Sequence, residues 1–168
     1  MIKSFNSLFV TMFGLGKIKY MPGTFGSLAT TIILYYLFHI LNVSTNSILI
    51  GLIIIFIYSF YAVSSHIENS ENKDPGEIVI DEFLGQSIPI YLYEISHGTT
   101  KNGSEAIIYY LLFFILFRYF DIMKPFPVNF FDKNFKNSFG VIMDDICAGL
   151  YVVLTLICFM IIKSYVLQ

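Results

Sequence analysis

Charged side chains are scarce in this 168-residue chain: ten are basic, twelve are acidic, and together they make up 13% of the residues. The net charge is −2 and no basic stripe is present, so the chain lacks the phosphate-neutralising surface of a nucleic-acid-binding protein. Hydrophobic residues reach 56%, above the roughly 45–50% of an average soluble domain, which excludes a disordered chain. The length predicts a single domain over residues 1–168.

The chain has only two cysteines and no tryptophan. Cys147 and Cys158 lie in apolar surroundings without the spacing of a disulfide framework or a metal site, so we interpret both as small buried side chains. Neither is followed by an arginine six positions later, as the cysteine-phosphatase loop requires. The Asp-x-Asp-x-Thr/Val nucleophile motif and the P-loop are missing as well. A covalent cysteine or phosphoaspartate route therefore has no support in the sequence.

The few charges that occur are concentrated in two stretches. Residues 20–67 contain none, whereas residues 68–82 hold seven and residues 118–145 hold eight. A solvated surface would scatter its charges along the chain. The distribution instead predicts apolar helices joined by two polar connections that carry the chemistry.

Long apolar runs fill most of the remaining chain. Residues 25–41 reach the lower limit of about 17 for a membrane span, and residues 47–65 approach the ~20 that a span needs. Together these two runs predict a helical hairpin. Residues 146–162 are apolar apart from Thr155 and predict a further span.

Shorter segments complete the pattern. Residues 2–13 predict a short amphipathic helix, and the glycine-rich residues 21–27 predict a loop. The apolar runs at 83–93, which Pro89 should break, and at 106–117 fit either tilted or re-entrant helices or helices buried in protein.

We therefore predict an all-α fold, a compact bundle of mostly apolar helices embedded in or associated with a membrane. For both polar connections to share one site they must face the same side, so the helices before each of them run out and back. Lys3, Lys17 and Lys19 would then lie on the site side. The positive-inside rule assigns that side to the cytoplasm.

Two pairs of adjacent acids, Asp81-Glu82 and Asp144-Asp145, each precede an apolar run. Adjacent carboxylates repel each other unless a cation or a proton lies between them. Hard oxygen ligands of this kind, together with substrate phosphate, suit Mg²⁺. The alternative is that both pairs occupy helix N-termini, where negative charge interacts favourably with the helix dipole.

Arg118 is the only arginine, and it directly follows an apolar run, three residues before Asp121. This spacing predicts an Arg118–Asp121 ion pair on one helical face. The planar guanidinium also suits two phosphate oxygens, and the two interpretations are compatible. Pro125 should end this helix near Lys124.

The segment Pro22-Gly-Thr-Phe-Gly-Ser27 combines glycines with two hydroxyl side chains. Glycines let backbone N–H groups approach an anion, and a helix N-terminus that follows favours negative charge. The alternative is that Thr24 or Ser27 simply caps the next helix.

Four segments together resemble those of the phosphatidylglycerophosphatase A family of bacterial lipid phosphatases, and they occur in that family's order. The segments are Pro22-Gly-Thr-Phe-Gly-Ser27, Asp74-Pro with Glu77-Ile-Val-Ile-Asp-Glu-Phe-Leu-Gly85, Phe117-Arg-Tyr-Phe-Asp-Ile-Met-Lys-Pro-Phe-Pro127, and Met143-Asp-Asp-Ile-Cys-Ala-Gly149. The resemblance covers residues 9–153. One departure is that Asn137-Ser138 with Gly140 replaces the Gly-Gly often found before the family's last segment.

The resemblance implies a helical enzyme of the bacterial inner membrane that uses Mg²⁺ to hydrolyse phosphatidylglycerol phosphate. The products would be phosphatidylglycerol, a precursor of cardiolipin, and inorganic phosphate. The expected metal ligands are Asp81, Glu82, Asp144 and Asp145. The expected phosphate-binding residues are Gly23, Thr24, Ser27, Arg118 and Lys124. The expected catalytic residues are Asp74, as a base or a cation-orienting group, with Asp81, Arg118, Asp121, Lys124 and Asp145.

The alternative function is a small membrane transporter or a cation-binding membrane protein. Carboxylates near helix ends would then line a cation path. The acids, however, are grouped with Arg118 and Lys124, which suits an anionic lipid headgroup better than a cation.

Overall fold

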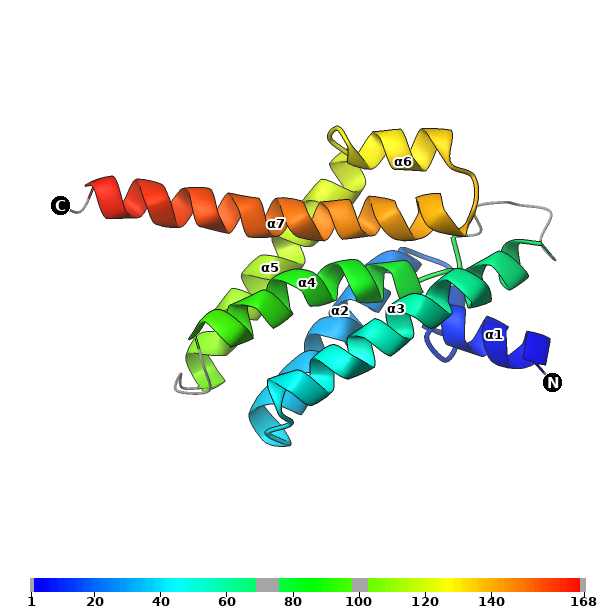
Figure 1. Cartoon of the computed structure of the whole chain (residues 1–168), viewed down its shortest axis with the longest axis horizontal. Coiled ribbons are helices and arrows are strands. Elements are labelled where there is room, and N and C mark those ends of the chain that lie inside the picture. Colours follow the sequence, from blue (N-terminus) through cyan, green and yellow to red (C-terminus); the bar gives the residue numbers. More distant parts are fainter. Residues whose placement is uncertain (1, 69–75, 98–102, 167–168) are drawn as a thin grey trace.

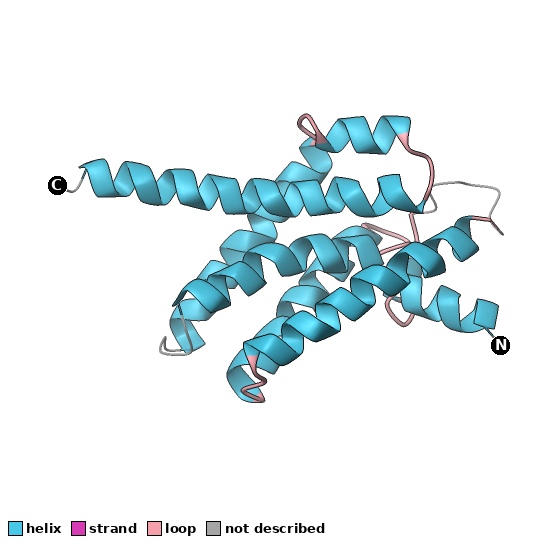
Figure 2. Ribbon diagram, in the orientation of Figure 1, coloured by secondary structure: helices cyan, strands magenta, loops and turns pink. Residues whose placement is uncertain are grey.

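The computed structural model describes residues 2–68, 76–97 and 103–166, and all of its regular elements are helical. In chain order they are α1 (Ile2–Val10), the 3₁₀ turn η1 (Leu15–Lys17), α2 (Pro22–Tyr35), the π-helical turn η2 (Tyr36–Ile40), α3 (Thr45–Ile67), α4 (Ile80–His97), α5 (Gly103–Met123), α6 (Val128–Asn134) and α7 (Ser138–Val166). The described residues contain no strand, which confirms the predicted all-α class (Figure 2).

Four helices are long and apolar enough to cross a membrane: Pro22–Ile40, Thr45–Ile67, Glu105–Met123 and Ser138–Tyr165. A helix rises 1.5 Å per residue, so about 20 residues match a hydrocarbon core of about 30 Å. Many large apolar side chains on these helices are exposed, such as Ile54 and Ile57 on α3 and Ile162 on α7. The chain is therefore a membrane protein, and the predicted hairpin of α2 and α3 is confirmed.

Helix α4 occupies the centre of the bundle, where it packs against α2, α3, α5 and α7 (Figure 1). The N-terminal ends of α2, α4 and α7 meet the C-terminal end of α5 around one cavity. At the same end, His66 near the C-terminus of α3 contacts Glu77 just before α4, with 2.8 Å between Nε2 and Oε1. The described parts of both polar connections therefore face one side of the bundle, as predicted.

Two glycines set the crossing of α4 and α7. A Cβ atom added to Gly149 would lie 2.3 Å from the carbonyl oxygen of Gly85, and one added to Gly85 would lie 2.4 Å from the carbonyl oxygen of Asp145. Only glycine permits such a close approach of two backbones. The crossing thus brings the Asp145 segment of α7 directly against α4.

At the far end of the bundle, a buried polar cluster connects α4, α5 and η2. Glu94 of α4 is 3% exposed, and its Oε1 accepts a hydrogen bond from the hydroxyl of Tyr110 at 3.0 Å. The same oxygen lies 3.1 Å from Nε2 of His39 in η2. One carboxylate therefore connects three helical segments at the end opposite to the cavity.

Three local predictions are wrong. Residues 21–27 are not a loop, because α2 begins at Pro22, whose fixed φ suits the first helical turn. Its glycines serve close packing instead: a Cβ on Gly26 would lie 3.0 Å from Val79 Cβ. Pro89 does not break α4, because packing against four other helices outweighs one lost hydrogen bond.

The third wrong prediction concerns the cysteines. Cys147 is half-buried, but Cys158 is exposed. Figure 1 gives the reason, since the C-terminal half of α7 extends beyond the other helices. Most side chains from residue 154 to residue 165 are therefore exposed in the described structure.

Candidate active site

A cavity of about 260 Å³ lies at the end of the bundle where the polar connections meet. Four segments contribute to its wall: the start of α2, the start of α4, the end of α5, and the stretch from α6 to α7. The polar residues that line it are Asp81, Glu82, Arg118, Asp121, Lys124, Asp132, Lys136, Asp144 and Asp145. Nine of the chain's few ionisable groups therefore surround one small space.

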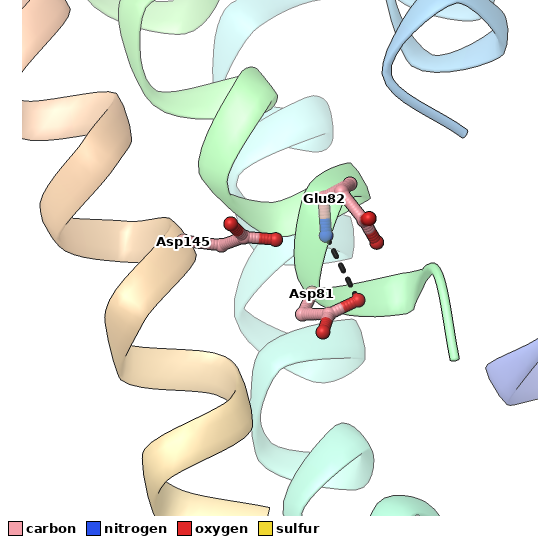
Figure 3. A group of neighbouring side chains, drawn as sticks. All are labelled: Asp81, Glu82 and Asp145. Carbon is pink, nitrogen blue, oxygen red and sulfur yellow. Dashed lines mark hydrogen bonds between the residues drawn. The ribbon is translucent and has the colours of Figure 1, made fainter. Parts of the chain in front are cut away.

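Three carboxylates form a compact group at the buried side of this cavity. Asp81, Glu82 and Asp145 each present one oxygen, and these three oxygens lie within 4.8 Å of one another. Figure 3 shows Asp145 projecting from α7 toward the two acids of α4. Asp81 is 8% exposed and Asp145 is 3% exposed, so water does little to screen the repulsion between their charges.

Burial raises the pKa values of the two acids of α4, Asp81 and Glu82. Desolvation, followed by repulsion from Glu82, holds the pKa of Asp81 well above its usual range. Desolvation also raises the pKa of Glu82 to about 7. At neutral pH a bound proton or cation would therefore stabilise this group of acids.

The group has the donor chemistry that Mg²⁺ requires. Its ligand atoms are hard carboxylate oxygens from two rigid helices, and Oε2 of Glu82 is buried without a hydrogen-bond partner in the described part of the chain. Asp81, Glu82 and Asp145 thus fit a magnesium ion.

Helix-dipole interaction does not account for both acidic pairs. Asp81 and Glu82 lie in the first turn of α4, where the dipole favours negative charge. Asp144 and Asp145, however, lie inside α7, which begins at Ser138. The dipole effect falls off within the first turn, so the second pair needs another partner.

Arg118 is held against the carboxylates from the side of α5. Its Nη1 lies 2.6 Å from Asp121 Oδ2 and 3.9 Å from Glu82 Oε1, and it donates a 3.5 Å hydrogen bond to Ser27 Oγ. The predicted ion pair with Asp121 is therefore present. Nε of Arg118 is buried and has no hydrogen-bond partner among the described residues.

Lys124 lies at the sharp end of α5, with φ at +43°. Its ammonium contacts Asp132 Oδ1 at 2.8 Å and Asp144 Oδ2 at 3.0 Å. Burial opposes the charge of this group, but the hydrogen bonds and charges of the two acids outweigh burial and raise the pKa of Lys124. The side chain therefore stays protonated through the whole neutral range.

Gly23 provides room for this arrangement. A Cβ atom on Gly23 would lie 2.0 Å from Glu82 Oε1 and 3.1 Å from Arg118 Nη1. The first turn of α2 can press against both side chains because this residue has no side chain of its own.

The structure groups most, though not all, of the predicted residues around the cavity. Those that line it are Gly23, Asp81, Glu82, Arg118, Asp121, Lys124, Asp144 and Asp145. Asp144 stands outside the three-carboxylate group and pairs with Lys124 instead. Asp74 lies outside the described residues.

Thr24 and Ser27 do not line the cavity. Ser27 is fully buried, and its hydroxyl donates to the carbonyl oxygen of Gly23 at 2.8 Å. Because it also accepts from Arg118, its contact with the site is indirect. Oγ1 of Thr24 is buried and has no hydrogen-bond partner among the described residues.

Two charged residues of the cavity were not among the predicted site residues. Asp132 lies on α6 and Lys136 follows it, and both line the cavity. They were missed because no apolar run marks this seven-residue helix. Their membership in the charge-dense stretch 118–145 was the signal that was available.

Comparison with known proteins identifies the family. The model of the family described as phosphatidylglycerophosphatase A matches residues 8–160. A relative named phosphatidylglycerophosphatase A from Haemophilus influenzae is 37% identical over 142 residues, which is 84% of this chain and 80% of that protein. One with the same name from Escherichia coli is 32% identical over 82% of this chain and 73% of its own length.

A further relative, from Bacteroides thetaiotaomicron, is named "Putative phosphatidylinositol-3-phosphatase" and is 33% identical over 84% of both chains. No solved structure matches the chain. The match to the family covers both acidic pairs, Arg118 and Lys124, so it includes the whole described cavity. The chain belongs to the phosphatidylglycerophosphatase A family and is, like its members, a phosphatase.

Proposed function

We propose that this enzyme uses Mg²⁺ to hydrolyse the terminal phosphate monoester of phosphatidylglycerol phosphate, releasing phosphatidylglycerol and inorganic phosphate. The observation that carries the proposal is one cavity in which two buried carboxylates and the partly buried Glu82 lie beside Arg118 and Lys124 at the end of apolar helices. The substrate is supported by the two relatives that bear the name phosphatidylglycerophosphatase A.

In this reaction a water oxygen forms a bond to phosphorus and the ester bond between phosphorus and the glycerol oxygen breaks. That oxygen takes a proton and becomes a hydroxyl group of phosphatidylglycerol. Asp81, Glu82 and Asp145 would hold the magnesium ion. When bound, Mg²⁺ neutralises phosphate charge and makes a coordinated water more acidic.

The two cations act on the phosphate itself. Arg118 and Lys124 bind non-bridging oxygens, whose negative charge is redistributed in the transition state. Each cation is already oriented by carboxylates, Arg118 by Asp121 and Lys124 by Asp132 and Asp144. Such preorganisation means that little rearrangement is needed when the substrate arrives.

We further propose that the enzyme lies in the bacterial inner membrane with its cavity facing the cytoplasm, where it supplies phosphatidylglycerol for phospholipid and cardiolipin synthesis. The cavity end of the bundle carries the exposed lysines 17, 19, 133 and 136, whereas Lys163 lies at the far end of α7. An excess of lysine is typical of cytoplasmic segments.

The test is phosphate release from phosphatidylglycerol phosphate by the purified full-length protein in mixed micelles, with Mg²⁺ and with EDTA. We expect release with Mg²⁺ only. Asp81→Asn and Asp145→Asn should abolish it while the circular dichroism spectrum keeps its helical signal. Glu105→Gln is the matched control, since this exposed acid begins α5 at the opposite end. Near-normal turnover in both aspartate variants, or release that ignores EDTA, would overturn the metal assignment.

A second substrate deserves a parallel assay because one relative is named for a phosphatidylinositol 3-phosphate activity. Phosphatidylinositol 3-phosphate also carries a phosphate monoester on a polyol headgroup. A higher kcat/KM for this lipid than for phosphatidylglycerol phosphate would replace the substrate and leave the reaction type unchanged.

A further inference from the structure

Three basic side chains line the cavity, and they differ in how they are paired. Arg118 is bound to Asp121, and Lys124 is bound to both Asp132 and Asp144. Lys136 is exposed and forms no ion pair with any described residue. It is therefore the one cavity cation in the described structure that has no carboxylate partner.

Lys136 also lies at a different depth from the reacting groups. The carboxylates of Asp81 and Asp145 are almost fully buried, whereas Lys136 is open to the outside. The cavity thus has a buried acidic side, where the monoester would react, and an open side with one unpaired ammonium.

Aromatic side chains border this open side. Phe135, which precedes Lys136, also lines the cavity, and its ring centroid lies 5.9 Å from that of Phe131 and 5.5 Å from that of Phe139. Phe126 and Phe130 nearby are 72% and 44% exposed. Exposed apolar side chains of this kind are typical of surfaces that contact a membrane, so the open side of the cavity is the side from which a lipid would enter.

The proposed substrate carries two phosphates, and only one of them is hydrolysed. The monoester lies at the end of the headgroup glycerol, and a phosphodiester joins the other end of that glycerol to diacylglycerol. With the monoester at the buried acids, the diester lies one glycerol unit nearer to the lipid, toward the open side. We propose that the ammonium of Lys136 binds this phosphodiester and so selects lipids that carry a second phosphate. The inference rests on the proposed function.

The experiment measures KM and kcat for phosphatidylglycerol phosphate in mixed micelles, together with the inhibition constant of inorganic phosphate, which reports on the monoester end alone. A charge-assisted hydrogen bond at an exposed site corresponds to about a tenfold change in binding. Lys136→Gln should therefore raise KM roughly tenfold, change kcat less than about twofold, and leave the inhibition constant of phosphate unchanged. Lys136→Arg should retain most of the binding.

Lys133→Gln is the matched control, because Lys133 is an exposed lysine three residues earlier that does not line the cavity. It should behave as wild type. An unchanged KM in Lys136→Gln, or an inhibition constant of phosphate that rises together with KM, would overturn the assignment of Lys136 to the diester. If the wild-type protein itself releases no phosphate from the lipid, the proposed function fails instead, so the two failures are distinguishable.

Discussion

Gly23 and Glu82 are so close that a Cβ atom added to Gly23 would lie 2.0 Å from Glu82 Oε1. The atom in the way is the end of a flexible side chain, not backbone. A methyl group at this position would therefore displace the carboxylate of Glu82 and leave α2 and α4 packed.

We expect Gly23→Ala to lower activity 10- to 100-fold, the range in which metal sites respond to displaced ligands or supports. The Mg²⁺ concentration for half-maximal activity should rise as well. The melting temperature, followed by circular dichroism because the chain lacks tryptophan, should change little.

Gly51→Ala is the matched control for this substitution. A Cβ on Gly51, in the second turn of α3, would meet no atom within 4 Å, and alanine is the better helix former. This variant should keep wild-type activity. If Gly23→Ala shows a wild-type Mg²⁺ requirement, Glu82 is not a ligand of the ion.

Gly85→Ala should behave differently, because the obstacles there cannot move away freely. The added Cβ would lie 2.4 Å from the backbone oxygen of Asp145 and 2.7 Å from Phe117 Cε2. Overpacking of this kind typically costs about 1–3 kcal/mol of stability. We expect a melting temperature several degrees lower together with reduced activity, since α7 must shift and carry Asp145 with it. A wild-type melting curve would argue against the close crossing of α4 and α7.

The helices were predictable where apolar length decided the outcome, and were misjudged where packing decided it. The run 47–65 became α3 with nearly the expected limits because its length leaves few alternatives. In contrast, Pro22–Ser27 has the composition of a loop, and it is helical because its glycines fit against Val79 and Glu82. Those partners are more than 50 residues away, so no local pattern reveals them.

The site followed a similar rule. Acids next to an apolar run indicate a function because an unpaired carboxylate there is costly, and this argument identified Asp81 and Asp145. The sequence did not predict the different partners of the second pair: Asp144 contacts Lys124, whereas Asp145 lies beside the acids of α4. Adjacent residues on a helix point about 100° apart, and the sequence does not say which partner each direction meets.

Asp132 is expected to act as a positioning residue for Lys124. Its carboxylate contributes to the raised pKa of that lysine and holds the ammonium at 2.8 Å. Asp132→Asn should lower kcat/KM about tenfold and should lower the pKa of Lys124. Activity on the alkaline side, where deprotonation of Lys124 removes its charge, should then be lost at a lower pH than in wild type.

The pH–rate profile separates this role from a structural one. Asp132→Glu keeps the charge and should restore most of the alkaline activity. An Asp132→Asn variant that is slower but has an unchanged alkaline limb would show that Asp132 supports α6 rather than the charge of Lys124.

Stability of the metal-free protein should depend on pH through the acids of α4. Burial raises the pKa of Glu82 from its ordinary value of 4.5 to about 7, and the pKa of Asp81 is raised in the same direction. Between these two pH values the folded protein binds more protons than the unfolded chain, so the free energy of unfolding falls as pH rises. In EDTA the melting temperature should therefore drop by several degrees between pH 5 and pH 8.

Mg²⁺ should reverse this trend, because it stabilises the ionised carboxylates and competes with protons for them. Saturating Mg²⁺ should raise the melting temperature strongly at pH 8 and little at pH 5. Glu82→Gln removes one of the titrating groups and should flatten the dependence in EDTA. If the melting temperature of the wild type in EDTA rises from pH 5 to pH 8, folding does not raise the pKa values of Asp81 and Glu82. Equal stabilisation by Mg²⁺ at both pH values would mean that the ion binds elsewhere.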